Sequence, residues 1–355
     1  MLVVVPGVRQ LEVAELSHFP EDDSAALTAR GRALRRAVPR DSQATWAPPA
    51  DRPDPLDLIE WRNRNRLSEL VAIRWGRMLA SPFAFYRGSP YVMAHDLSST
   101  PTTGVNVQIC GDAHLLNFGL FATPERHLVF DVNDFDETLP GPWEWDVKRL
   151  AASVVIAARA NGFSKSSVAS AAVSVGRSYR QMTAALARQG MLSVWYSKLE
   201  LDQASRVLRE TLLANPRRSA IDRARQNDHH RSLKKLTQQV DGRLQIREHP
   251  PLIVRITDPA VLDHATELFN EYMATIPEQR RVLLRSFRLM DAAQKVVGVG
   301  SVGTRCSVAL LLGLNNDHCS CRSRKPSPRS SSRSSARAPM RIPLVGWSSV
   351  NTRCR

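Results

Sequence analysis

Hydrophobic residues recur at helical spacing along several stretches of the chain. From Asp57 to Met78 they return every three or four positions, with arginines on the other face, which predicts an amphipathic helix. The segment SPFAFYRGSP (81–90) contains Pro and Gly and predicts the end of that helix. The same spacing predicts helices over 146–160, 164–189, 192–213 and, as one or two helices, 259–289. Asp146 and Ser164 stand where they would cap two of these helices.

Shorter apolar runs predict strands between the helices. VNVQIC (105–110) alternates between apolar and polar residues, and HLVFDVNDFDE (127–137) begins as an apolar run and ends in a cluster of acids. PPLIVRI (250–256) predicts a strand, and residues 295–313 predict two strands around a Gly-rich turn. We interpret LPGPWEWD (139–146) as a rigid turn. This mixture of helices and strands predicts an α+β fold.

The two ends of the chain lack this patterning. Residues 1–55 are mixed in character and finish in a Pro/Asp-rich stretch, so we predict a poorly structured N-terminal segment. Residues 317–355 are rich in Ser, Arg and Pro, which predicts a disordered basic tail. A second interpretation of this tail is translation in a shifted reading frame. Residues 56–316 between them are the predicted folded domain.

Much of the net charge of +15 comes from the tail. Residues 317–355 hold nine Arg and Lys against one Asp, a charge of +8, which leaves about +7 for the rest of the chain. A strongly basic protein often binds nucleic acid. Because the excess lies in the tail, we expect nucleic acid as a partner only through that segment.

Composition also bears on location and on cysteine chemistry. No window holds the roughly 18 or more uninterrupted apolar residues of a membrane span. The apolar run at the start has no basic residues ahead of it, unlike a signal peptide. We therefore expect a cytoplasmic protein with no membrane partner. The odd number of cysteines favours neither a disulfide framework nor a zinc site: Cys110, Cys306, Cys319, Cys321 and Cys354.

The segment CGDAHLLNFG (110–119) carries candidate catalytic chemistry. Asp112 and Asn117 are five residues apart, as are the base Asp and the metal-binding Asn of a kinase-like catalytic loop. Asp134 follows the next apolar strand, beside Asp136, in an acidic segment that spans 128–137. Carboxylate and amide oxygens are ligands that suit Mg²⁺. The alternative is a turn in which the polar side chains of the loop bond only to nearby backbone.

His114 lies inside the same loop, where kinase-like loops carry a packing or hydrogen-bonding histidine. We count it with Asp112 among the candidate catalytic residues. The pair would also suit metal-dependent hydrolysis, but a second clustered histidine is lacking, and His127 is the nearest candidate.

Four stretches of the chain resemble the bacterial family known as domain of unknown function 2252. They are SPFAFYRG (81–88), VQICGDAHLLNFG (107–119), LVFDVNDFDETLPGPWEWDVKRLAAS (128–153) and GVGSVGTRC (298–306). The resemblance covers residues 56–314. It implies a distant relationship to protein kinases and aminoglycoside phosphotransferases. The implied fold is two-lobed and kinase-like, with a mostly helical larger lobe and an incomplete second lobe.

The resemblance also implies roles for individual residues. Asp112 would be the catalytic base, and Asn117 and Asp134 would be metal ligands. Asp131 and Asp136 are rivals for the role of Asp134, and we keep Asp136 among the candidate ligands.

Two features depart from the kinase pattern. Kinases place a Gly-rich loop and a phosphate-binding Lys before the catalytic loop, whereas the first lysine here is Lys148. The Gly-rich turn comes after the loop, with Gly298, Gly300 and Gly303. Either the order is permuted, or Arg87 neutralises phosphate instead; a plain hairpin is the alternative for the turn. Family members also continue into a strand that carries a Lys, whereas here the Ser/Arg tail follows.

The leading functional interpretation is phosphoryl transfer from ATP, with Mg²⁺, to a hydroxyl group of a small molecule or a protein. The alternative is an inactive nucleotide-binding pseudokinase or a truncated product without activity. A third interpretation is a nucleic-acid-binding protein that uses the basic tail.

Overall fold

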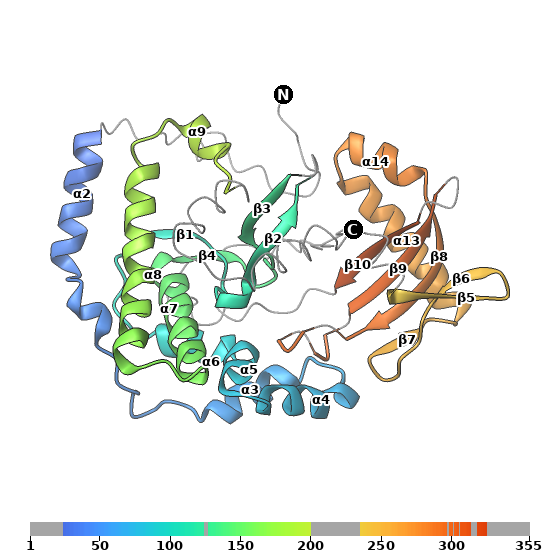
Figure 1. Ribbon diagram of the computed structural model, residues 1–355, viewed down its shortest axis with the longest axis horizontal. Coiled ribbons are helices and arrows are strands. Elements are labelled where there is room, and N and C mark those ends of the chain that lie inside the picture. Colours follow the sequence, from blue (N-terminus) through green and yellow to red (C-terminus); the bar gives the residue numbers. More distant parts are fainter. Residues whose placement is uncertain are drawn as a thin grey trace.

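The computed structural model describes residues 24–123, 127–199, 235–296, 298–300, 302–304, 306–313 and 318–324. These residues form helices and antiparallel sheets, so the predicted α+β class is confirmed. In Figure 1 the helices of the N-terminal half lie on the left and the largest sheet lies on the right. One small strand pair, β2 (Phe118–Ala122) with β3 (Leu128–Val132), lies between them, whereas β1 (Asn106–Ile109) and β4 (Leu139–Pro142) lie among the helices (Figure 1).

The helices of the N-terminal half begin where the sequence supplies caps. Asp54 accepts a hydrogen bond from the Leu56 N–H at the start of α3, and Ser81 accepts one from the Ala84 N–H at the start of α5. Ser164 caps α8, as predicted. The bounds are α2 (Ser24–Ala37), η1 (Asp41–Ala44), α3 (Pro55–Asn63), α4 (Ser68–Leu79), α5 (Pro82–Gly88), α6 (Pro90–Leu97), α7 (Trp143–Ala160), α8 (Lys165–Leu186) and α9 (Met191–Trp195).

The single helix predicted over 57–78 is wrong, because the structure divides it into α3 and α4. Within the break, the backbone N–H of Leu67 donates to the carbonyl of Gly303 at 2.9 Å. A continuous helix would have used this N–H for its own ladder. The break therefore frees a backbone donor that binds the distant Gly-rich turn.

The segment 81–90, predicted only to end a helix, contains helix α5 and the start of α6. Pro82 and Pro90 each stand at the first position of a helix. Proline is tolerated there because its missing N–H would have no helical partner. The prolines thus begin two short helices as well as ending the preceding one.

Two other segments of the N-terminal half, within residues 1–55 and 192–213, also differ from their predicted structure. Residues 1–55 were predicted to be poorly structured, but α2 and η1 lie within them, although no side chain of α2 is buried. The helix predicted over 192–213 ends at Trp195. Residues 200–234 lie outside the described residues, as do residues 1–23.

Two antiparallel strand pairs connect the helices. β1 (Asn106–Ile109) pairs with β4 (Leu139–Pro142), and β2 (Phe118–Ala122) pairs with β3 (Leu128–Val132). The strand predicted at 105–110 is confirmed over Asn106–Ile109, and the strand predicted to open 127–137 is confirmed over Leu128–Val132. The turn predicted over 139–146 is wrong, because these residues form β4 and the first turn of α7.

The C-terminal half is built on a four-stranded antiparallel sheet in the order β10-β9-β8-β7. Of the two strands predicted within 295–313, the second is confirmed as β9, whereas the first lies earlier, as β8, which begins at Arg288 where helix was predicted and ends at Lys295. Residues 318–324, predicted to belong to a disordered tail, form β10 instead, and residues 325–355 lie outside the described residues. The bounds are β5 (Thr237–Val240), β6 (Arg243–Ile246), β7 (Ile253–Arg255), α13 (Pro259–Thr275), α14 (Glu278–Arg285), β8 (Arg288–Lys295), β9 (Cys306–Leu312) and β10 (His318–Arg324).

Separate hydrophobic cores stabilise the two halves. One core joins β1, β4, α6 and α7, and its members are Ala94, Leu97, Ile109, Leu139 and Trp145. Alternate residues of β9 enter two further cores, with Val308 and Leu310 facing the β5–β6 hairpin and Leu311 facing α13 and α14. This alternation is expected for a central strand whose two faces are both covered.

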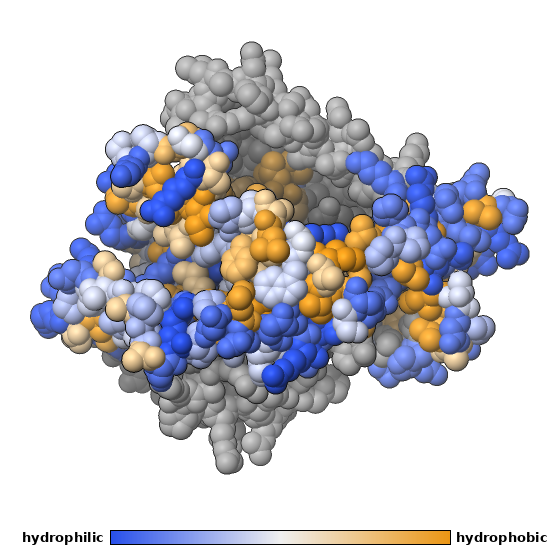
Figure 2. Space-filling model, turned by 90° about the horizontal axis from the view of Figure 1, so that it is seen from below, coloured by the Kyte–Doolittle hydropathy of each residue, from blue (hydrophilic) through white to orange (hydrophobic). Residues whose placement is uncertain are grey.

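The face of the molecule that carries α3 and α4 has both hydrophobic and polar residues. Figure 2, which views the molecule from below, shows hydrophobic residues near the middle of this face and polar residues around them. Leu56 of α3 and Leu79 of α4 are 53% and 72% exposed. Among the described residues, no helix combines the length and the hydropathy that crossing a bilayer requires.

Candidate active site

Two strand pairs bring the loop 110–119 and the acidic segment together. In the β1–β4 pair Ile109 lies opposite Leu139, so the start of the loop adjoins the end of the acidic segment. In the β2–β3 pair Phe118 lies opposite Val132, so the end of the loop adjoins the start of the acids. The two segments are therefore held side by side at both ends, although about twenty residues separate them in the sequence.

Asn117 links the loop to the acids through its side chain. Its Nδ2 donates to the carbonyl oxygen of Asp112 at 3.2 Å and to that of Asp134 at 3.0 Å, and it lies 3.3 Å from Sγ of Cys110. The residue is only 5% exposed. Because these contacts fix the amide nitrogen, the orientation of Oδ1 is fixed as well. An oxygen held in this way suits metal ligation better than a freely rotating one.

Gly111 allows the acidic segment to approach the loop closely. Its φ angle is +77°, in the left-handed region that glycine adopts without steric cost. A Cβ atom at this position would collide with the carbonyl group of Glu137. A glycine is therefore required here both by the backbone conformation and by the contact.

Helix α7 supports the loop from below through one face. Asp146 accepts the backbone N–H groups of Cys110 at 2.6 Å and Gly111 at 3.0 Å. Ser153, which is fully buried, accepts the N–H of Leu115 at 2.9 Å. The prediction that Asp146 caps the helix is wrong, because α7 begins three residues earlier and the carboxylate binds the loop instead.

Arg149 of the same helix contacts Asp112. Its Nε donates to Oδ1 of Asp112 at 2.6 Å, and its Nη2 forms an ion pair with the same oxygen. Burial raises the pKa of the Asp112 carboxyl to about 7, although the charge of Arg149 acts in the opposite direction. The candidate base thus lies in a low-dielectric environment with one cation beside it.

His114 is buried next to this pair, at 6% exposure. Its Nε2 lies 3.8 Å from Oδ2 of Asp112, and its ring packs edge-on against Phe83 with centroids 6.4 Å apart. Burial lowers the pKa of the histidine to about 4, and the charges of Arg149 and Arg87 add to this effect. The imidazole is therefore neutral at physiological pH, which fits a packing or hydrogen-bonding role.

The acidic side chains lie at the exposed rim of the site. Asp134 is exposed, and its Oδ1 accepts the backbone N–H of Asp136 at 3.3 Å. Glu137 forms an ion pair with Arg62 of α3 at 3.4 Å. Within the described ranges, no group of three or more His, Cys, Asp and Glu side chains is arranged to hold a metal ion.

The Gly-rich turn packs against helices α4 and α5. Arg77 of α4 donates to the carbonyl of Gly298 at 2.6 Å, and the Arg66 guanidinium donates to the carbonyl of Val302. A Cβ at Gly300 would lie 3.3 Å from the carbonyl oxygen of Arg87. The turn therefore joins the large sheet to the helical half, close to the segment that carries Arg87.

Arg87 completes the set of sequence-predicted residues. Its side chain is half-buried, and in the part of the chain that the structure describes its Nε has no hydrogen-bond partner. It belongs to α5, whose Phe83 packs against His114, so the helix that carries Arg87 adjoins the loop. The structure thus holds the loop and the acids side by side, and the Gly-rich turn packs against the helix that carries Arg87.

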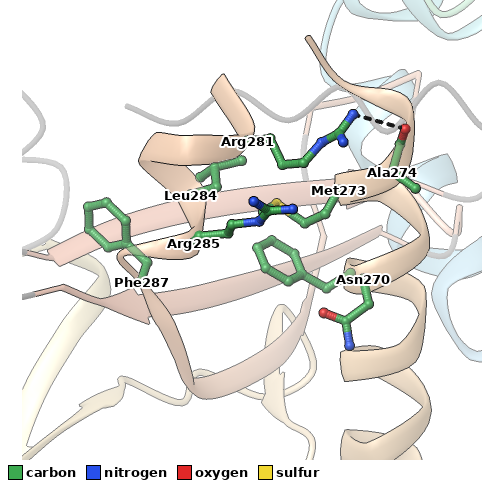
Figure 3. A pocket seen from close by; sticks show the side chains of 8 residues that line it. Asn270, Met273, Ala274, Arg281, Leu284, Arg285 and Phe287 are labelled. Atoms are coloured by element: carbon green, nitrogen blue, oxygen red, sulfur yellow. Dashed lines mark hydrogen bonds between the residues drawn. The ribbon is translucent and has the colours of Figure 1, made fainter. Parts of the chain in front are cut away.

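A separate cavity of about 440 Å³ lies between α13 and α14, on the sheet side of the molecule. Figure 3 shows Arg281 donating to the carbonyl of Ala274, a bond of 3.3 Å that ties the two helices together. None of the predicted site residues lines this cavity, whose lining is Phe269, Asn270, Met273, Ala274, Arg281, Leu284, Arg285 and Phe287.

Sequence reasoning missed two residues that hold the loop, Arg149 and Ser153. Together with Asp146 they stand at positions i, i+3 and i+7 of α7, which share one helix face. The available signal was a polar stripe on one face of the helix that follows the candidate loop.

Comparison with known proteins finds one family. A bacterial family described as an uncharacterised protein conserved in bacteria (DUF2252) matches residues 66–340. The matched range contains the loop, the acidic segment, α7 and the Gly-rich turn, and it extends past residue 316, where the folded domain was predicted to end. No curated protein and no solved structure matches the chain significantly.

Proposed function

We infer that this chain, which belongs to the bacterial family DUF2252, is an ATP- and Mg²⁺-dependent phosphotransferase of distant kinase-like ancestry. The acceptor is a hydroxyl group. Asp112 acts as the base that orients and deprotonates this hydroxyl, and His114 packs beside it as a neutral group. In this proposal the helical half and the sheet half correspond to the two lobes of a kinase-like fold, with the order of the phosphate-binding elements permuted.

The observation that carries the proposal is the bridge made by Asn117. One amide group bonds to the backbone of the candidate base and to the backbone of the candidate metal ligand, Asp134. A loop that merely turned the chain would need no contact with an acidic segment about twenty residues away. Phosphoryl transfer needs the two segments to lie close together, because the base and the metal must act on the same phosphoryl group.

The donor set fits a magnesium–nucleotide complex. Mg²⁺ in such sites is held through one or two carboxylates and by phosphate oxygens, and it keeps several waters. Asn117, Asp134 and Asp136 would supply this limited set of oxygens, and Asp131 is the rival carboxylate. A site of this kind does not require three clustered acids, so the described residues match it without a complete protein cage. When bound, Mg·ATP supplies the phosphoryl group.

Arg87 and the Gly-rich turn would hold the phosphates. Arg87 offers a cation whose Nε has no hydrogen-bond partner in the described residues, beside a glycine-containing turn that packs on its own helix. A guanidinium binds phosphate oxygens with two parallel hydrogen bonds, so it can neutralise phosphate where kinases use lysine.

Thermal unfolding of the full chain with and without ATP and Mg²⁺ tests the proposal. A ligand at one hundred times its Kd stabilises the folded state by about 2.7 kcal/mol, which raises Tm. We expect a Mg²⁺-dependent rise for the wild type and for Asp131→Asn, and none for Asp134→Asn. No rise in a wild type that melts cooperatively would refute the nucleotide site. If the Mg²⁺-dependent rise in Tm were lost in Asp131→Asn instead, Asp131 would be assigned as the metal ligand.

The alternative is a pseudokinase that binds nucleotide without turnover. It is favoured by the absence of any lysine before Lys148 and by the Ser/Arg-rich residues after 316. If those residues arise from a shifted reading frame, the chain lacks the phosphate-binding lysine of its relatives. A Mg²⁺-dependent rise in Tm without release of phosphate from ATP would support this alternative.

A further inference from the structure

Arg149 is a buried charge whose donors contact Asp112 and two neighbouring residues, Tyr86 and Met93. It is only 3% exposed, although an arginine side chain is usually found in water. Nε and Nη2 contact Asp112, Nη2 also donates to the carbonyl of Tyr86 at 3.2 Å, and Nη1 lies 3.6 Å from Sδ of Met93. These contacts hold the guanidinium in one orientation.

Tyr86 encloses Arg149 from a second side. The guanidinium carbon lies 4.5 Å from the centre of the Tyr86 ring, and the Tyr86 hydroxyl donates to the carbonyl of Arg149 at 2.8 Å. A cation over an aromatic ring is attracted to its face, more strongly when water is excluded. Helices α5 and α7 thus fix Arg149 before any ligand binds.

The contact with Asp112 is one-sided. Both nitrogens of Arg149 bind Oδ1. Oδ2 lies 3.8 Å from Nε2 of His114, beyond hydrogen-bonding distance. The Asp112 side chain is 21% exposed. One carboxylate oxygen is therefore occupied by the buried arginine, and the other is the oxygen that can meet a ligand.

We propose that Arg149 is a positioning residue, which holds Oδ1 of Asp112 so that Oδ2 faces the acceptor hydroxyl. This inference rests on the proposed function, because it assigns Arg149 to the same reaction. Arg149 itself touches neither nucleotide nor acceptor. It acts through Asp112, whose geometry relative to the acceptor sets the rate of the chemical step.

A purely structural ion pair makes a different prediction. If Arg149 only stabilised the fold, any variant that still folds would turn over normally. If it positions Asp112, a folded variant should lose kcat while the KM for ATP stays nearly constant. Loss of a transition-state interaction lowers kcat in this way, whereas loss of uniform binding raises KM.

The experiment measures steady-state phosphate release from Mg·ATP, with water as the acceptor, in the full chain. Arg149→Met should lower kcat on the order of 100-fold, the size expected for a misplaced catalytic group, with KM for ATP changed less than about twofold. Arg149→Lys keeps the charge but offers a single nitrogen, so it should restore part of the rate. Lys148→Met is the matched control. It removes a cation from the adjacent position of α7, and its Nζ contacts Thr100 rather than the loop.

Each outcome bears on the proposal. If Arg149→Met does not fold, Arg149→Lys carries the test, since a folded lysine variant with wild-type kcat would refute positioning. A fall confined to ATP affinity would also refute it. A wild type that binds Mg·ATP without any turnover overturns the role of Arg149 but leaves the nucleotide site in place. A wild type that does not bind Mg·ATP overturns both proposals.

Discussion

Replacement of Asp146 by asparagine should loosen the loop 110–119 while it leaves the rest of the fold in place. The carboxylate accepts two backbone N–H groups, one on each oxygen. Asparagine has the same shape but only one acceptor oxygen, so its NH₂ group would face a backbone N–H. One charge-assisted hydrogen bond is lost, and the other becomes a neutral bond.

The expected cost follows from these two changes. Hydrogen bonds to charged groups contribute about 1.5–3 kcal/mol each, and neutral ones contribute about 1 kcal/mol. Burial raises the pKa of Asp146, so the neutral side chain recovers part of the cost of burying a charge. We expect a net loss of about 1–3 kcal/mol in the free energy of unfolding of the loop.

Hydrogen exchange measured by mass spectrometry, together with urea unfolding, provides the assay. A loss of about 1.4 kcal/mol corresponds to tenfold faster exchange for amides that open locally, and we expect at least this for the loop. Asp258→Asn is the matched control. Asp258 caps α13 through the Ala260 N–H at 2.9 Å, and asparagine is an equally good cap. If Asp146→Asn changed loop exchange no more than the control does, the anchoring role of the carboxylate would be refuted.

Two further perturbations test the same region. Gly111→Ala should lower the free energy of unfolding by about 1–3 kcal/mol in urea titrations, because alanine must adopt a positive φ and its Cβ meets Glu137. Gly104→Ala, also at φ +77° but with open space around it, should cost less, and equal losses would contradict the predicted collision. Burial raises the pKa of the Asp112 carboxyl to about 7. The folded chain therefore binds a proton at Asp112 more tightly than the unfolded chain does. For this group, the free energy of unfolding falls as pH rises from about 4 to about 7. Asp112→Asn should remove that part of the pH dependence. If plots of the free energy of unfolding against pH for the wild type and the variant stayed parallel between about pH 4 and 7, this prediction would be refuted.

Part of the fold could be predicted from the sequence because its signals are local. The apolar runs of β1, β3 and β9 and the Ser164 cap of α8 act over a few residues, and the sequence predicts them correctly. The spacing of Asp112 and Asn117 likewise identified a loop whose residues the structure brings next to Asp134. These features depend on neighbours in the chain, so no knowledge of the tertiary structure was needed.

The errors arose where a tertiary partner overrides the local signal. Pro140 and Pro142 suggested a turn over 139–146, but they lie in β4, which pairs only with β1 in a two-stranded sheet. One edge of β4 therefore has no neighbouring strand, and the N–H groups that prolines lack are not needed there. The composition of residues 317–355 suggested disorder, but 318–324 pair with β9 through backbone groups, which every residue except proline can supply in full.

Arg149 could not be assigned from sequence for a stronger reason. In the run DVKRLAAS (146–153) residue type does not distinguish Arg149 from Lys148, since both are basic residues inside one helix, and only the spacing from Asp146 and Ser153 separates them. The difference lies in the side of α7 to which each belongs. Arg149 falls on the side of Asp146 and Ser153, which holds the loop, and Lys148 does not. A partner of opposite charge offsets part of the cost of burying a guanidinium, and Asp112 supplies it from another segment. The loop motif and the helix motif therefore define a single unit, and a substitution in either one should be judged by its effect on the other.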